Sequence, residues 1–303
     1  LTFGIYLATA FPSLPPKITA TTLIVLMVLI HTRTYRESSS GQYLLTLLKL
    51  LLIATFVLTA FASGSDFSHQ VTGTSLLNAG EILSGPGAIA LIYVTYAYSG
   101  WNAATYILGE LEHPQRDLPR ALIVGCALVT VLYVLLNTAF LTSASISSMT
   151  GEVEIAFIVA ETVLGESGAF IVSLLLSGVL ISTVSAMIMA GPRALQRLGQ
   201  DYRGLGWLGK TNQGGLPANA IAFMGLVALG FLWTSTFEQI LLFAGLVMAA
   251  NTFFTVVAVF VSRRRRMGLP NETSIFTMPW YPLPALIFLA ITGWTVLYTA
   301  IQY

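Results

Sequence analysis

The sequence has few of the residues on which soluble and catalytic proteins depend. Only 9% of its 303 residues are charged, whereas soluble domains carry about 25%. The net charge of +1 provides no basic surface for nucleic acid, so nucleic acid is not an expected partner. A single cysteine, Cys126, excludes an intrachain disulfide and a cysteine-based zinc site. Because Cys126 lies within an apolar run, we expect it to fill the core.

Residues for catalysis or for nucleotide-driven pumping are also scarce. The three histidines, His31, His69 and His113, lie at the ends of apolar runs or in the connections between them. The sequence contains no glycine-rich loop that would hold phosphate. We therefore predict no enzymatic activity, no cofactor and no metal site.

Apolar residues dominate, at 55% of the chain with a mean hydropathy of +0.80. A helix needs about 20 apolar residues to cross a hydrocarbon core of about 30 Å. The sequence predicts one all-α transmembrane domain over residues 1–303, with spans at about 1–11 (partial), 18–31, 43–62, 86–109, 119–142, 168–191, 216–234, 238–262 and 279–301. Residues 153–164 are helical in pattern but short and acidic, so we expect them to lie on or re-enter the bundle.

The chain opens at Leu1 inside an apolar segment that is too short to span a bilayer. It shows no initiator methionine and no secretory signal with a cleavage site. We therefore expect the sequence to be a fragment whose N-terminal spans are missing.

Basic residues collect on one side of the predicted spans. Twelve of the 14 lysines and arginines fall in loops on that side, Lys17 falls on the other, and Lys49 lies within a span. The positive-inside rule assigns the twelve to the cytoplasm. The densest group, Arg263–Arg266, follows a span directly and is interpreted as a topology anchor, with an anionic-lipid site as the alternative.

One apolar run is interrupted in its middle by small and aromatic residues. This interrupted segment, residues 95–102, contains the candidate site residues Tyr96, Ala97, Tyr98, Ser99, Gly100, Trp101 and Asn102. Broken helices at membrane depth line cavities and hold substrate in secondary transporters, which favours a binding site. The alternative is that glycine and serine only permit close helix packing here.

Lys49 is the one ionisable residue clearly inside a predicted span. An intramembrane charge is costly unless it reaches the interface or has a partner, so Lys49 is a functional candidate. Serines recur at helical spacing in a later span, as Ser173 with Ser177 and Ser182 with Ser185. We interpret these serines as interhelical hydrogen-bonding groups.

The interrupted segment, with Gly109-Glu110 and the turn at residues 113–121, resembles the sixth span and following loop of the amino acid, polyamine and organocation (APC) transporters. The resemblance is strongest to the L-type branch, in a bacterial-type form. Further resemblances follow in order along the chain. They are Gly41-Gln42 with Lys49 in the fifth span, Gly191-Pro192-Arg193 ending the eighth, Leu216–Ala220 starting the ninth, and Phe237-Glu238-Gln239 with the arginine run in the tenth.

The resemblance implies a leucine-transporter-type bundle of inverted repeats, of which this chain holds the end of the third span through the eleventh. It implies that Tyr96 is an aromatic gate, that the carbonyls of Tyr96, Ala97 and Ser99 accept the substrate ammonium, and that Gly100 gives it room. Trp101 and Asn102 would line the inner side. It further implies that Lys49 takes the place of a sodium ion, near the hydroxyls of Ser182 and Thr183.

The expected function is that of a secondary active amino acid permease or exchanger for neutral L-amino acids, independent of sodium, in the cell membrane. The alternatives are a cationic amino acid or polyamine antiporter of the same fold and a non-transporting amino acid sensor. The interrupted segment contains no acidic residue, which disfavours cationic substrates. The loop Phe11–Lys17 lacks the cysteine through which animal L-type carriers bind a glycoprotein, so we expect no disulfide-linked heavy chain.

Overall fold

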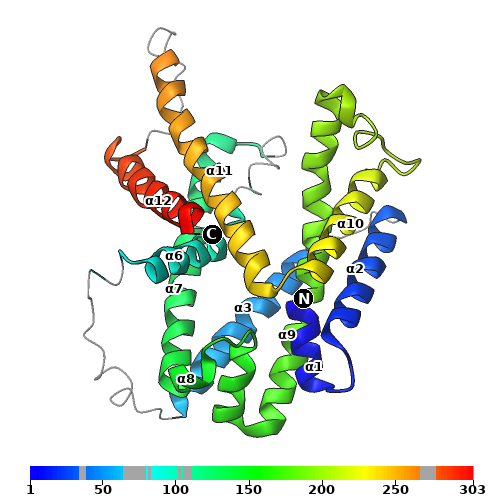
Figure 1. Cartoon of the computed structure of the whole chain (residues 1–303), viewed down its shortest axis with the longest axis vertical. Helices are drawn as coiled ribbons and strands as arrows, with labels where there is room; N and C mark the ends of the chain where they lie inside the picture. Colours follow the sequence, from blue (N-terminus) through cyan, green and yellow to red (C-terminus); the bar gives the residue numbers. More distant parts are fainter. Residues whose placement is uncertain are drawn as a thin grey trace. The chain divides into compact units, whose positions relative to one another are not determined.

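The computed structural model describes residues 1–33, 39–63, 80, 83–101, 104, 111–266 and 278–302. Within these ranges every regular element is a helix, as Figure 1 shows. The prediction of an all-α protein is confirmed. In chain order the helices are α1 (Thr2–Ala10), α2 (Pro16–Arg33), α3 (Ser39–Ala62), α6 (Gly85–Ala97), α7 (Pro114–Ser143), α8 (Ile146–Met149), α9 (Ile155–Asp201), η2 (Arg203–Leu205), α10 (Ala218–Thr234), α11 (Phe237–Arg266) and α12 (Leu283–Gln302).

Five of the described helices are long and apolar enough to cross a membrane, namely α3, α7, α9, α11 and α12. Their apolar surfaces are largely exposed, and no residue in the apolar window of α7 is buried inside the protein. Cys126 lies on this exposed surface of α7, so the prediction that it fills the core was wrong. In a helix that faces lipid, an apolar residue needs no protein core, because the bilayer supplies the apolar surroundings.

The chain forms two compact units, and each is described by itself. The first comprises Leu1–Gly73 and Val131–Thr236. In it α1 packs against α2 and α9, and α2 packs against α9 and α10 (Figure 1). Gly4 of α1 lies against the carbonyl group of Pro16, where a Cβ atom would overlap that oxygen. The close contact between α1 and the start of α2 therefore depends on a glycine.

The second unit comprises Thr74–Thr130 and Phe237–Tyr303, in which α6, α11 and α12 pack against one another. Gly245 of α11 lies against α6, and a Cβ atom on it would come within 2.6 Å of Ile92 Cγ2. Ile92 itself is fully buried. A side chain at position 245 would push the two helices apart.

Helix α9 bends at Gly165, whose φ of 71° and ψ of −179° are not helical. Residues 155–164 precede this bend and the remainder of α9 follows it. The short acidic segment predicted from the sequence is thus a separate helical piece joined to the longer one.

The same helix contradicts one expectation, since Gly191-Pro192-Arg193 does not end it and α9 continues to Asp201. A proline inside a helix loses one hydrogen bond and costs about 3 kcal/mol. The four residues after Arg193 (Ala-Leu-Gln-Arg) have high helix propensity, and Pro192 is buried against neighbouring residues. Propensity and packing together maintain the helix across the proline.

Helix α7 begins at Pro114, five residues before the proline that the sequence suggested as its first residue. Pro114 fits the first helical position, where the missing N–H would have no partner, and Asp117 adds the negative charge favoured in a first turn. Pro119 therefore lies inside the helix.

One side-chain amide fixes the loop between α9 and α10. Asn212 Oδ1 accepts hydrogen bonds from the N–H groups of Gly214 and Leu216, both at 3.0 Å. Asn212 Nδ2 donates to the carbonyl oxygen of Thr32 in the last turn of α2, at 2.8 Å. A single residue thus closes the loop and attaches it to α2.

We predict that Asn212→Ala lowers the free energy of unfolding by about 1–3 kcal/mol, because the backbone groups of three residues lose a hydrogen-bond partner. The measurement is the melting temperature of the purified protein. Gln213→Ala is the matched control, since Gln213 is exposed and forms no hydrogen bond within the described residues. Equal melting temperatures for the two variants would contradict the role given to Asn212.

Candidate functional site

Helix α6 ends inside the interrupted segment. Its last residue is Ala97, and Tyr98 leaves the helix with φ −89° and ψ 4°. The N–H of Tyr98 still bonds to Val94 O, and that of Ser99 bonds to Tyr96 O, both at 3.0 Å. Gly100 then takes φ 96°, a backbone conformation that glycine adopts without steric cost. The helix therefore ends in a defined turn at the place where the sequence is interrupted.

Gly100 is required here by its backbone conformation rather than by lack of space. Among the described residues, a Cβ atom added to it would have no heavy atom within 4 Å. The rings on either side are half-exposed, at 38% for Tyr96 and 41% for Trp101. The turn therefore presents two half-exposed aromatic side chains. Asn102, the last predicted site residue, lies outside the described residues.

The carbonyl oxygen of Tyr96 is both a hydrogen-bond acceptor within the turn and a predicted ligand of the substrate. It already accepts the N–H of Ser99, and the family resemblance assigns it a substrate ammonium as well. A carbonyl oxygen has two lone pairs, and Tyr96 O also accepts the N–H of Tyr98. A substrate ammonium at Tyr96 O would therefore share this oxygen with two backbone N–H groups.

Two contacts with α11 hold the end of α6 and were not foreseen from the sequence. Tyr93 Oη donates to Glu238 Oε1 at 3.3 Å. A Cβ on Gly245 would lie 3.2 Å from Ile92 O and 3.5 Å from Tyr96 Cβ. These partners are about 145 residues apart, and no local spacing rule connects positions so distant. In the sequence, the only sign of this packing is Gly245, a glycine inside an apolar helix.

In the first unit, the structure brings Lys49 to one of its two predicted hydroxyl neighbours. Lys49 Nζ donates to Thr183 Oγ1 at 3.3 Å, and Thr183 Oγ1 donates in turn to Val179 O at 3.0 Å. The hydroxyl of Ser182 is buried and has no hydrogen-bond partner within the described residues. The Lys49 ammonium group is therefore hydrogen-bonded to Thr183 and not to Ser182.

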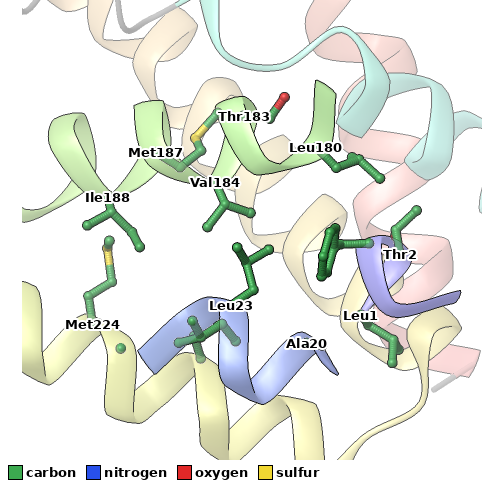
Figure 2. A pocket seen from close by; sticks show the side chains of 14 residues that line it. Leu1, Thr2, Ala20, Leu23, Leu180, Thr183, Val184, Met187, Ile188 and Met224 are labelled. Carbon is green, nitrogen blue, oxygen red and sulfur yellow. The ribbon is translucent and has the colours of Figure 1, made fainter. Parts of the chain in front are cut away.

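An apolar cavity of about 420 Å³ lies beside Thr183, between the start of α1 and helices α2, α9 and α10 (Figure 2). Its wall is formed mainly by aliphatic and thioether side chains, among them Leu23, Val184, Met187, Ile188 and Met224. In Figure 2 the hydroxyl oxygen of Thr183 points away from these side chains. The cavity wall therefore suits an apolar group and contains no ionisable side chain.

Of the four serines in α9 that the sequence singled out, two bond to neighbouring helices as expected. Thr9 Oγ1 of α1 donates to Ser173 Oγ at 2.9 Å. Ser185 Oγ and His31 Nε2 of α2 lie 3.1 Å apart. Ser177 instead donates to Ser173 O within its own helix, at 2.8 Å. Polar groups on α9 thus connect it to α1 and α2.

A family model described as "Amino acid permease" matches residues 1–302. The chain belongs to the amino acid permease family. This membership confirms the resemblance to the L-type branch of the APC transporters and the expected class of fold, a multi-pass all-α membrane protein. The family consists of permeases, so the expectation that the protein is not an enzyme is also confirmed.

Individual relatives of this permease bear names of the same kind. The chain is 25% identical over 291 residues to the b(0,+)-type amino acid transporter 1 of Mus musculus, covering 91% of this chain and 58% of the relative. It is 25% identical over 277 residues to the branched-chain amino acid permease BcaP of Lactococcus lactis, covering 88% and 58%. Over 173 residues it is 29% identical to the large neutral amino acids transporter small subunit 2 of Mus musculus, covering 54% and 33%. The chain thus spans under two thirds of the length of these relatives.

We predict that Thr183→Val destabilises the permease by about 1–3 kcal/mol, since it leaves the half-buried Lys49 ammonium without this acceptor. Thr183→Ser retains a hydroxyl and is the control that should keep the parental melting temperature. In a Lys49→Met background, Thr183→Val should have much less effect, because the charge that needs the hydroxyl is gone. Equal effects in both backgrounds would show that the two side chains are not coupled.

Proposed function

We propose that the protein is a secondary active transporter that carries neutral L-amino acids across the cell membrane without sodium. The observation that carries the proposal is the end of α6 at Ala97, followed by the left-handed Gly100. Broken helices of this kind hold substrate in secondary transporters. The names of its relatives, which are amino acid transporters and permeases, support an amino acid as the cargo.

In this proposal the seven residues Tyr96–Asn102 bind the amino acid. The turn after α6 offers backbone carbonyl groups to the ammonium group of the substrate, which suits carbonyl dipoles in a low-dielectric site. Gly100 leaves open space on the same turn. Tyr96 and Trp101 present half-exposed rings for contact with the rest of the substrate.

The charge of the site supports a neutral side chain on the substrate. The interrupted segment contains no carboxylate. Glu238, which approaches α6 one turn earlier, accepts a hydrogen bond from Tyr93. A basic or polyamine substrate would require a carboxylate for its second positive charge.

The contact between Lys49 and Thr183 supports independence from sodium. An ammonium group at this place brings a fixed positive charge to a hydroxyl that would otherwise serve as an oxygen ligand. Ser182, next in the chain, contributes a second buried hydroxyl. In this arrangement the lysine supplies the charge that a sodium ion supplies elsewhere in the wider superfamily.

We further propose that the transporter works without a disulfide-linked partner chain. The loop between α1 and α2, residues 11–15, contains no cysteine, and the sole cysteine of the sequence lies on α7.

Uptake by the intact protein in liposomes tests the proposal. We expect saturable uptake of a radiolabelled neutral amino acid such as leucine, inhibited by other neutral amino acids and not by arginine or putrescine. Replacing sodium with choline should leave the rate unchanged, whereas Lys49→Ala should reduce it at least tenfold with normal expression. Inhibition by arginine would favour the cationic carrier, strict dependence on sodium would contradict the role of Lys49, and binding without uptake would favour a sensor.

Gly100→Val tests the interrupted segment itself. Valine disfavours the positive φ of this position by on the order of 1 kcal/mol or more and pushes the turn toward continuous helix. We expect loss of leucine binding and of leucine-induced thermal stabilisation, with little change in the melting temperature of the unliganded protein. Gly125→Val in α7 is the matched control, because Gly125 also has open space but an ordinary φ. Parental leucine affinity in Gly100→Val would remove this turn from the site.

A further inference from the structure

The end of α11 and the turn before α12 bring arginine and aromatic side chains together in the second unit. Four arginines, Arg263–Arg266, are the last residues of α11. The guanidinium carbon of Arg263 lies 3.9 Å from the centre of the Tyr281 ring. This distance is well within the range of a cation–π interaction. We call Arg263, Arg264, Arg265, Trp280 and Tyr281 the arginine–aromatic patch.

The Tyr281 ring is itself held in place, so the stacked arginine has a fixed position. Its centre lies 5.5 Å from that of Phe260, one turn before Arg263 on α11. Arg264 and Arg265 are exposed, and within the described residues neither forms an ion pair with a carboxylate. Stacking thus orders one guanidinium group while two neighbouring ones remain available to an anion.

Trp280 stands out for both its exposure and its backbone. Its side chain is 84% exposed, and its φ is 57°. Left-handed backbone is unusual for a bulky residue and often marks a functional position. Leu283 at the start of α12 is also exposed, at 57%. The chain therefore presents a large aromatic ring and an aliphatic side chain beside unpaired positive charges.

We propose that the arginine–aromatic patch binds the headgroup of an anionic phospholipid. Arg264 and Arg265 donate paired N–H groups to the phosphate oxygens, since the guanidinium fork matches phosphate geometry. Trp280 and Leu283 contact the glycerol region and the first acyl carbons, where tryptophan is favoured in membranes. Arg263 stays stacked on Tyr281 and adds positive charge.

Two features favour a lipid over a soluble phosphate compound or an acidic protein. The patch lies where two membrane-length apolar helices, α11 and α12, meet. The stacking of Arg263 on Tyr281 joins the arginine run to the segment that carries the exposed Trp280 and Leu283, which fits a ligand that has a charged head and an apolar tail. A run of arginines that served only to orient the protein would need neither the stacked tyrosine nor the exposed tryptophan.

The test is lipid binding to the intact protein in neutral detergent. Dioleoylphosphatidylglycerol and dioleoylphosphatidylcholine are titrated separately, and bound lipids are counted by native mass spectrometry. We expect tighter binding of phosphatidylglycerol than of phosphatidylcholine. Each arginine near an anionic lipid surface contributes roughly a fivefold gain in binding, so Arg264→Gln with Arg265→Gln should weaken phosphatidylglycerol roughly 25-fold.

A charge-matched control separates a built site from general attraction. Arg33→Gln with Arg203→Gln removes the same charge from two exposed arginines on the same predicted side of the membrane and should leave lipid binding unchanged. Trp280→Gly removes the ring at a position whose φ glycine accepts. It should lose phosphatidylglycerol affinity several-fold without a fall in melting temperature.

Three outcomes would overturn the proposal. They are equal loss of binding in the two double variants, parental binding in Arg264→Gln with Arg265→Gln, and displacement of the lipid by inorganic phosphate at equal concentration. The first would reduce the patch to general charge, the second would place the lipid elsewhere, and the third would make the ligand a free phosphate.

Discussion

A backbone N–H or C=O group inside a bilayer has no water to bond, and leaving it unpaired costs several kcal/mol. This constraint decides what kind of interruption α6 can contain. The turn after Ala97 retains the bonds from Tyr98 N–H and Ser99 N–H to carbonyl groups of the preceding turn. The helix thus stops without leaving these two donors unpaired, and Gly100 follows in the left-handed region. In the proposed site, backbone carbonyl oxygens of this turn are the acceptors for the ammonium group of the substrate.

The same constraint governs the polar side chains within the helices. Thr183 and Ser177 each donate to a carbonyl group four residues earlier, which satisfies the hydroxyl hydrogen inside the helix. The oxygen of Thr183 still has a lone pair, and Lys49 uses it. A hydroxyl that is satisfied in this way can accept a lysine without any rearrangement of the helix. Ser182 is different, because its buried hydroxyl has no partner within the described residues. Within the described residues, Lys49 therefore bonds to the hydroxyl of Thr183 and not to that of Ser182.

Local signals in the sequence predicted the end of α6 correctly, but they predicted the end of α9 wrongly. Glycine and serine beside aromatic residues interrupt an apolar run at residues 95–102, and the helix does end there. Gly191-Pro192 is an equally strong local signal, yet α9 continues through it. Pro192 is buried by its neighbours and is followed by strong helix formers, whereas no heavy atom of the described residues lies within 4 Å of a Cβ atom placed on Gly100. The prediction that Cys126 fills the core was wrong because hydrophobicity does not distinguish a lipid-facing surface from a protein core.

Long-range packing gives the end of α6 its fixed position, and this could not be read from spacing. Tyr93 and Tyr96 are three residues apart and so share one face of α6. That face meets α11, through the bond from Tyr93 to Glu238 and through the close approach of Gly245 to Ile92 and Tyr96. These contacts involve Ile92, Tyr93 and Tyr96, and among the described residues no heavy atom lies within 4 Å of a Cβ atom placed on Gly100. The aromatic part of the proposed site is therefore built on a rigid helix pair. In the proposed site, the turn at Gly100 is free of these contacts and would adjust to a bound amino acid while Tyr96 stays in place.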